Sequence, residues 1–206
     1  LTLSSTSPTL TLYAQWTSNL TITTPTSGLT GTHGSSYSLT IASSGGAGTK
    51  TYSLVSGTLP SGLSLGSSSG EISGIPTQAG SYPITVRITD ADNNTATTSS
   101  FTITINSQAL ANAATPTVSA TSATLKSISV SWSAVANASS YTLKLYASNG
   151  TTLLATLMSL SGTSKTITTS DYPSLADNTQ YKISLTAVGS GNYLTSAESA
   201  QASVTT

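Results

Sequence analysis

Regular alternation of apolar and polar residues constrains the fold of this chain more than any other feature. The clearest case is Ser81–Asp90, in which every second residue is apolar. The apolar positions are Tyr82, Ile84, Val86 and Ile88. A period of two is typical of a half-buried β-strand, and no stretch of the chain has a helical period. We therefore expect an all-β fold.

Residues 18–106 are predicted to form the first of two domains. Turn residues divide this stretch into seven strand candidates. These are Leu20–Thr24, Ser36–Ala42, Thr49–Val55, Gly62–Leu65, Gly70–Gly74, Ser81–Asp90 and Thr95–Ile105. The Asp and Asn residues of Asp90–Asn94 favour a tight connection between the last two strands, because both residue types tolerate left-handed backbone. Seven short strands with frequent turns are typical of an immunoglobulin-like β-sandwich.

A family resemblance accompanies this pattern. The stretch from Leu59 to Asp90 contains LPSGLSL and SGEISGIPTQAGSYPITVRITD. These segments resemble the immunoglobulin-like (dystroglycan-type cadherin-like) domain of large bacterial surface proteins. The resemblance implies an extracellular sandwich domain within a multidomain protein.

Residues 116–206 are predicted to form a second sandwich after a short linker, residues 107–115. Asn149-Gly150 is a strong hairpin signal. Leu175–Tyr181 has the spacing of a sandwich corner in which a buried tyrosine hydroxyl bonds back to the chain. Together with Trp132, this order of motifs resembles a fibronectin type III domain. The predicted architecture is two tandem immunoglobulin-like β-sandwiches with an extra N-terminal β-strand.

The extra strand falls in residues 1–17, which are too few for a domain. Leu10, Leu12 and Trp16 share one face of this strand. Thr11–Thr17 resembles the last strand of the small repeat of bacterial internalin-type surface proteins. A severed apolar strand frays unless something buries it. We expect it to be an assembly strand that docks on another copy, with packing on its own chain as the alternative.

Composition excludes several partners. Charged residues are 6% of the chain and the net charge is zero, against about a quarter charged in ordinary soluble domains. Nucleic acid and anionic membranes need clusters of Lys and Arg, and the chain has none. No apolar run approaches the roughly 20 residues that cross a bilayer, so any signal or anchor is expected outside this stretch. The absence of cysteine excludes disulfides and thiolate metal sites.

No catalytic residue is predicted. The only histidine, His33, lies in a predicted loop without a recognisable orienting carboxylate. Gly66–Gly70 matches the G-x-S-x-G nucleophile pattern, but that elbow needs a helix after it, and a strand is expected there. No carboxylate lies in an apolar setting that would raise its pKa for glycosidase chemistry. The chain is therefore not expected to be an enzyme or to need a cofactor, calcium aside.

Four weaker signals concern ligands and modifications. Asp90, Asp92 and Asn93 offer hard oxygen ligands for calcium, although the same residues are ordinary in turns. A Lys–Asn isopeptide cross-link would need a lysine among apolar neighbours, and Lys144 points away from them. Asn-x-Ser/Thr sequons occur about as often as chance allows. Three aromatic residues outside the expected core could form a platform for sugars. They are Tyr146, Tyr172 and Tyr193.

The leading interpretation is a non-catalytic structural or adhesion module of a bacterial surface or secreted protein. It would serve as a stalk, an adhesin segment or a self-assembling filament subunit. Its expected partners are other copies of itself, neighbouring domains, and surface glycans or host cell surfaces. The alternative is a carbohydrate-binding or spacer module of a secreted polysaccharide-degrading enzyme. Either reading places the protein outside the cell.

Overall fold

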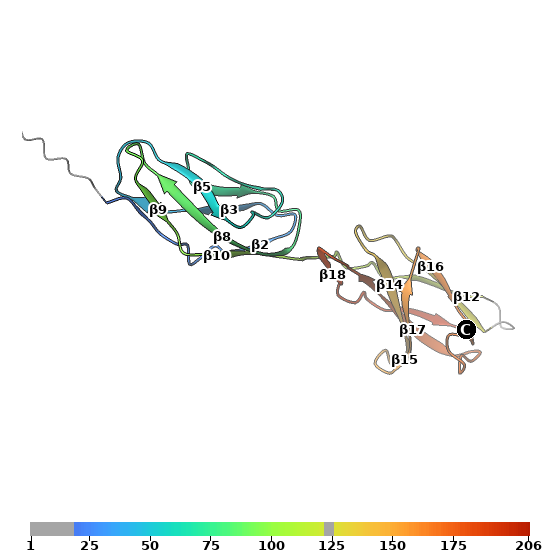
Figure 1. Ribbon diagram of the computed structural model, residues 1–206. Coiled ribbons are helices and arrows are strands. Elements are labelled where there is room, and N and C mark those ends of the chain that lie inside the picture. Colours follow the sequence, from blue (N-terminus) through green and yellow to red (C-terminus); the bar gives the residue numbers. More distant parts are fainter. Residues whose placement is uncertain (1–18, 122–125) are drawn as a thin grey trace, which may run out of the picture.

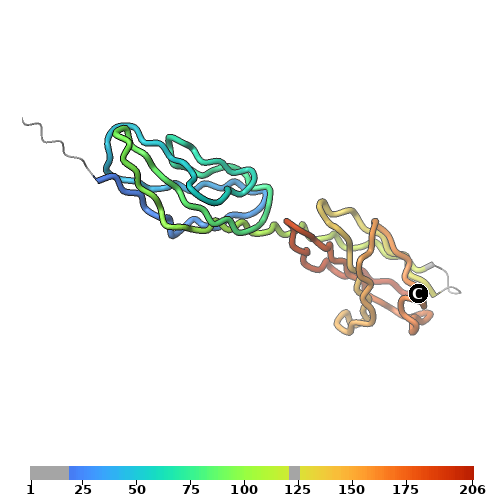
Figure 2. The backbone as a smooth tube through the Cα atoms, viewed as in Figure 1, coloured from blue at the N-terminus to red at the C-terminus, as the bar shows by residue number. Residues whose placement is uncertain are grey.

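The computed structural model describes residues 19–121 and 126–206, and in these ranges the fold is all-β. Two groups of strands form two lobes that follow one another along the chain, joined by a single crossing (Figures 1 and 2). The predicted assembly strand, with Leu10, Leu12 and Trp16, lies outside the described residues. Among the described residues, no helix could span a membrane.

The first lobe is a sandwich of two larger sheets, with its first and fourth strands paired in a separate two-stranded sheet. Its strands are β1 (Thr21–Ile22), β2 (Thr30–Thr32), β3 (Tyr37–Thr40), β4 (Ser43–Ser44), β5 (Thr51–Ser56), β6 (Leu63–Leu65), β7 (Glu71–Gly74), β8 (Gly80–Thr89), β9 (Thr95–Thr97) and β10 (Phe101–Asn106). One sheet has the order β2-β10-β8-β5, with β9 also paired to β8, and the other has the order β3-β7-β6. The apolar face of β8 lies between them, where Ile84 and Val86 are fully buried in a core with Phe101 and Ile103. The alternation in the sequence therefore sets which face of β8 is buried.

The second lobe has the same layered design. Its strands are β12 (Thr117–Thr121), β13 (Ser127–Ser131), β14 (Ser140–Ala147), β15 (Leu153–Leu160), β16 (Ser164–Ile167), β17 (Gln180–Val188) and β19 (Ala202–Thr205). Sheet β12-β13-β16 faces sheet β15-β14-β17-β19. Trp132 is buried against Tyr141, with their ring centroids 5.4 Å apart. The predicted corner is confirmed, because buried Tyr181 accepts a hydrogen bond from the Ala176 N–H through its hydroxyl, at 2.9 Å.

The predicted turns are also confirmed. Asn149 and Gly150 lie in the hairpin between β14 and β15, and the Asn149 Oδ1 atom accepts from two backbone N–H groups beyond it. Asp90–Asn94 connects β8 to β9, with Asn93 in the left-handed region at a φ of 63°. The left-handed residue is thus Asn93 in the second turn and Gly150, at a φ of 74°, in the first.

Segments differ from expectation in both lobes. The strand predicted over Thr95–Ile105 is divided into β9 and β10, because the chain leaves the sheet at Ser99 and Ser100. The stretch 107–115, predicted to be a linker, contributes β11 (Gln108–Ala109) and two residues buried in the second core. Strand β11 pairs in parallel with β18 (Tyr193–Leu194). The predicted linker is thus largely part of the second lobe, since its apolar side chains find a core there.

Where edge segments depart from regular strand pairing, buried side-chain hydroxyl groups accept the hydrogen bonds that backbone carbonyls accept in a regular sheet. Thr98 donates its backbone N–H to the Val86 carbonyl and accepts the Val86 N–H with its side-chain oxygen. Ser196 makes the same pair of bonds to Ala187, and Ser199 to Leu185. All three hydroxyl residues are buried. The central strands β8 and β17 therefore keep their backbone groups satisfied although the neighbouring segment is irregular, as buried polar groups require.

Replacing Ser199 by alanine is expected to lower the free energy of unfolding by about 1–3 kcal/mol, because the Leu185 N–H would lose its acceptor inside the protein. Ser203→Ala is the matched control, since Ser203 is exposed on β19, and such substitutions usually stay within about 0.5 kcal/mol. Urea unfolding of both variants measures the difference. Equal effects of the two substitutions would contradict this role of the hydroxyl.

Candidate functional site

A group of charged and polar side chains lies on the outer face of β14 and β17, opposite the core. Lys144 and Tyr146 project there from β14, and Ser184 from β17. Glu198 comes from the irregular segment that precedes β19. Ser184 is fully buried although it occupies an outward position, because this segment covers it. We call these four residues the Glu198 cluster.

Three donors converge on the carboxylate of the Glu198 cluster. The Lys144 ammonium lies 2.6 Å from Glu198 Oε2. The hydroxyl groups of Tyr146 and Ser184 both donate to Oε1, that of Tyr146 at 2.7 Å. The carboxylate therefore ties one edge segment to the two central strands of the sheet.

The pKa values in the cluster favour a structural role over proton transfer. Burial alone would raise the pKa of Glu198, but the hydrogen bonds from Lys144, Ser184 and Tyr146 lower it to about 2. The hydrogen bond to Glu198 raises the pKa of Lys144, against the opposing effect of burial. At neutral pH the carboxylate is ionised and the amine is protonated. The two groups therefore do not act as a general acid–base pair. An isopeptide bond needs a free amine, whereas Lys144 carries an ammonium group.

The Glu198 cluster predicts a specific loss of stability in acid. A lowered pKa in the folded state stabilises the protein fully above the unfolded pKa near 4.5, and that contribution is lost as the pH falls toward about 2. Glu198→Gln should therefore lower the Tm at pH 7 and have almost no effect at pH 2, as followed by calorimetry. Lys144→Gln should show the same trend, because it removes the first donor to the carboxylate. A Tm difference that stays constant from pH 7 to pH 2 would contradict the assignment.

The predicted calcium ligands lie in the turn between β8 and β9. Asp90 is only 5% exposed, and both of its carboxylate oxygens already accept hydrogen bonds. Oδ1 accepts from the backbone N–H groups of Asp92 and Asn94, and Oδ2 from the N–H of Ala47 and the Asn94 side chain. The bond from Ala47 is the largest cause of the lowered pKa of Asp90. Asp92 and Asn93 are exposed in the same turn.

This geometry assigns Asp90 to the fold, because its oxygens close the turn and bind it to the loop before β5. Among the described residues, no group of three or more His, Cys, Asp or Glu side chains is arranged to hold a metal ion. Calcium binding at Asp90, Asp92 and Asn93 stays a prediction.

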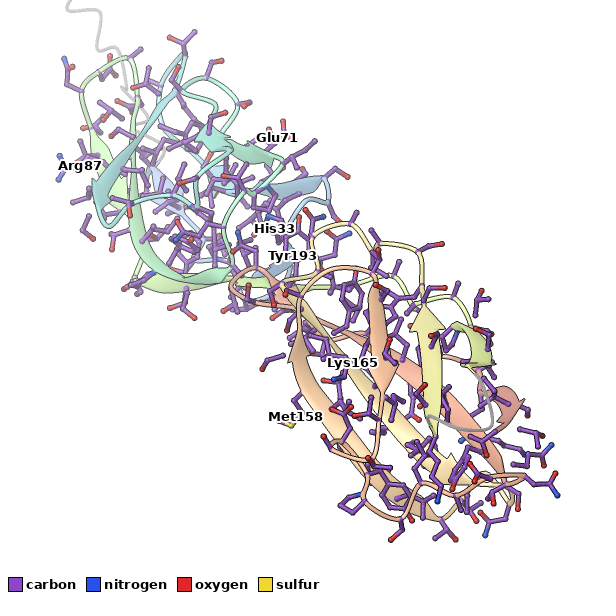
Figure 3. The ribbon with its side chains drawn as sticks, turned by 90° about the vertical axis from the view of Figure 1, so that its right-hand side faces the viewer. His33, Glu71, Arg87, Met158, Lys165 and Tyr193 are labelled. Carbon is purple, nitrogen blue, oxygen red and sulfur yellow. The ribbon has the colours of Figure 1, made fainter. Side chains whose placement is uncertain are left out.

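Gly66–Gly70 and His33 are the two sequence features considered for catalysis and not expected to carry it. Gly66–Gly70 forms a turn that leads directly into strand β7, as expected, so no helix follows the serine. His33 follows β2, and its ring lies edge-on to that of Tyr193, with centroids 5.1 Å apart. Its Nδ1 atom is buried and has no hydrogen-bond partner. Figure 3 shows His33 and Tyr193 where the two lobes meet.

Asn192 forms the centre of this contact between the lobes, which we call the junction. Its side-chain oxygen accepts from the Ala79 N–H at 2.9 Å, and its side-chain amide donates to the Thr77 carbonyl at 3.2 Å. Its own carbonyl accepts from the Gln108 N–H. One side chain of the second lobe thus satisfies two backbone groups of the first.

The three tyrosines predicted as a sugar platform make separate contacts. Tyr193 belongs to the junction, and Tyr146 to the Glu198 cluster on the outer face of the sheet. Tyr172 packs edge-on against Tyr181, in the core on the opposite face. The structure does not gather these rings into one surface. Sequence reasoning missed Glu198 and Asn192, because neither belongs to a motif and their partners are distant in sequence.

Two solved structures match this chain with low TM-scores. A Fn3-like protein from Clostridium thermocellum matches with 24% identity and a TM-score of 0.37, over 46% of this chain and 91% of that one. The FN1–FN3 domains of chicken CNTN1 match with 15% identity and a TM-score of 0.40, over 92% of this chain and 64% of theirs. No curated protein matches.

The family comparison covers more than the described part of the first lobe. The model of the family described as "Putative Ig domain" matches residues 2–106, which is just over half of the chain. The chain therefore belongs to the Putative Ig domain family.

Proposed function

We propose that this chain is a stiff, non-catalytic spacer module of a bacterial surface or secreted protein, which joins neighbouring copies into a filament. The junction is the observation that carries this proposal. A spacer must hold its ends apart, and the junction fixes one lobe on the other by hydrogen bonds from Asn192 and by the contact between His33 and Tyr193. Membership of an immunoglobulin-like family supports a structural role.

The chemistry of the charged groups supports a role without catalysis. The described carboxylates with lowered pKa values are Asp90, Asp171 and Glu198. Each accepts hydrogen bonds that hold a turn or an edge segment in place. Carboxylates committed in this way remain ionised at neutral pH and have no proton to donate to a substrate.

The proposed joining element is residues 1–17, with Leu10, Leu12 and Trp16 on one apolar face. An extended segment of this kind can add a strand to an exposed sheet edge, with main-chain hydrogen bonds giving affinity. If each copy gives its strand to the next, the contact is heterologous and the assembly is a filament. With few charged residues and zero net charge, the chain would not oppose such association.

Removing residues 1–17 tests this proposal. The described residues contain two hydrophobic cores, so we expect the shortened chain to fold, and circular dichroism checks that it does. Multi-angle light scattering should show concentration-dependent assembly of the full chain and a monomer of the shortened one. An unchanged mass distribution after the deletion would eliminate the filament.

A further inference from the structure

The exposed apolar side chains of the described residues are concentrated on two edge strands. Large apolar residues with high exposure are Leu54, Val55, Ile75, Leu153, Met158 and Leu194. Four of these six belong to β5 and β15. Each of these strands lies at the end of its sheet, so one side of its backbone has no neighbouring strand among the described residues.

Strand β15 is the more open of the two edges. Leu153 is 50% and Met158 67% exposed, whereas Leu54 and Val55 on β5 are 37% and 45% exposed. Strand β15 has eight residues and no charged residue or proline, and β5 has six residues. Natural edge strands are usually short or carry lysine or proline, because an open uncharged edge recruits other strands. Ser159, with a φ of 57°, ends the straight part of β15.

We propose that the β15 edge is the acceptor for residues 9–16 of a neighbouring copy. This inference rests on the proposed function and names the surface that receives the joining strand. The donor stretch has eight residues and no charge, and its apolar and polar residues alternate with a period of two. It therefore matches β15 in length and offers Leu10, Leu12 and Trp16 to the exposed Leu153 and Met158.

The donor segment of the same chain cannot reach this edge. Leu20 lies beside Gly46 and Asp90, at the end of β8 that is remote from the second lobe. The other end of β8 follows Ala79, which contacts Asn192 at the junction. Ten residues of strand span about 30 Å, whereas the three steps from Trp16 to Asn19 span at most about 11 Å. Strand β15 lies beyond the junction (Figure 1), so its donor comes from another copy.

Strand β5 is the competing acceptor, and its geometry differs in a way that can be tested. Thr51 pairs with Thr89, near the end of the lobe where Leu20 lies. A donor on β5 could therefore come from the same chain, which would bury the strand without any assembly. The greater length and exposure of β15 favour the acceptor on the second lobe.

Paired variants of the full chain test this inference. Leu10→Lys with Leu12→Lys blocks the donor, and Leu153→Lys with Met158→Lys blocks the β15 edge. Leu54→Lys with Val55→Lys is the matched control on β5. The edge substitutions fall on exposed positions, so unchanged circular dichroism and Tm are expected. Light scattering should show a monomer of about 20.7 kDa for each of the first two variants alone, and assembly like that of the unaltered chain for the β5 variant.

Mixing the donor-blocked variant with the edge-blocked variant gives the decisive result. The donor-blocked variant still has a free edge, and the edge-blocked variant still has a free strand. Their mixture should form a 1:1 dimer that grows no further. Two monomers that fail to combine would overturn the inference.

The other outcomes separate this inference from the proposed function. If only the donor block prevents assembly, the strand joins copies at another edge, and β15 is not the acceptor. If the β5 variant fails to assemble instead, β5 is the acceptor. Assembly of the donor-blocked variant, or a monomeric unaltered chain, would remove both the filament and its acceptor.

Discussion

Replacing Asp90 by alanine is expected to lower the Tm of the first lobe by roughly 10 °C or more. The buried carboxylate accepts four hydrogen bonds, three from backbone N–H groups and one from the Asn94 side chain. Alanine would leave these donors without acceptors and would release the turn from the loop at Ala47. Asp90→Asn should also destabilise the lobe, because its amide group would face two of the donors. Differential scanning calorimetry measures both shifts.

Asp92→Ala is the matched control for Asp90. Asp92 lies in the same turn, but its side chain is exposed. The control should therefore keep the Tm of the unaltered chain if the turn acts without metal. The same scans with calcium and with chelator address the calcium prediction. A Tm that rises with calcium in the unaltered chain, but not in Asp92→Ala, would establish a metal site. Asp90 would then act as a part of that site and not only as a structural residue.

Replacing Asn192 by alanine is expected to free the two lobes from each other without unfolding either. Two hydrogen bonds across the junction would be lost, with a combined contribution of about 1–3 kcal/mol. The contact between His33 and Tyr193 would remain, but backbone groups of Thr77 and Ala79 would lose their partner. With Leu10→Lys and Leu12→Lys also present to keep the chain monomeric, nitrogen-15 relaxation should then report a shorter rotational correlation time for each lobe.

Asn112→Ala provides the comparison for Asn192. Asn112 also uses its side-chain oxygen, but it accepts from Ala197 inside the second lobe. Its loss should change the stability of that lobe and leave the two lobes tumbling as one unit. If both variants keep the correlation time of the donor-blocked chain that has Asn192 and Asn112 intact, Asn192 does not hold the junction.

The sequence predicts the fold well where local patterns decide it. Alternation along Ser81–Asp90 gives strand β8 almost to the residue, and the asparagines near Asp90 and at Asn149 mark two of the turns. The spacing before Tyr181 predicts the corner and its hydroxyl bond. Each of these features arises from neighbours within a few positions of the chain, so a single sequence is enough to recognise it.

The features that position the candidate sites depend on distant contacts. Short strand β2 was not predicted, because Thr-Gly-Thr has no alternation and becomes a strand only through its parallel pairing with β10. Glu198 is an isolated acid in the sequence, and only the fold brings Lys144 and Ser184 to it. The same is true of Asn192, whose side-chain partners are more than 100 positions away. The division of the strand predicted over Thr95–Ile105 follows from the bonds between Thr98 and Val86.

Small-angle X-ray scattering of the donor-blocked variant, Leu10→Lys with Leu12→Lys, tests the stiff spacer most directly, because that variant should be monomeric. The account predicts one extended particle, longer than the roughly 60 Å that β8 and β17 span together end to end. The scattering curve should fit a single arrangement of the two lobes. A compact particle with the lobes side by side, or a curve that requires many arrangements, would contradict it.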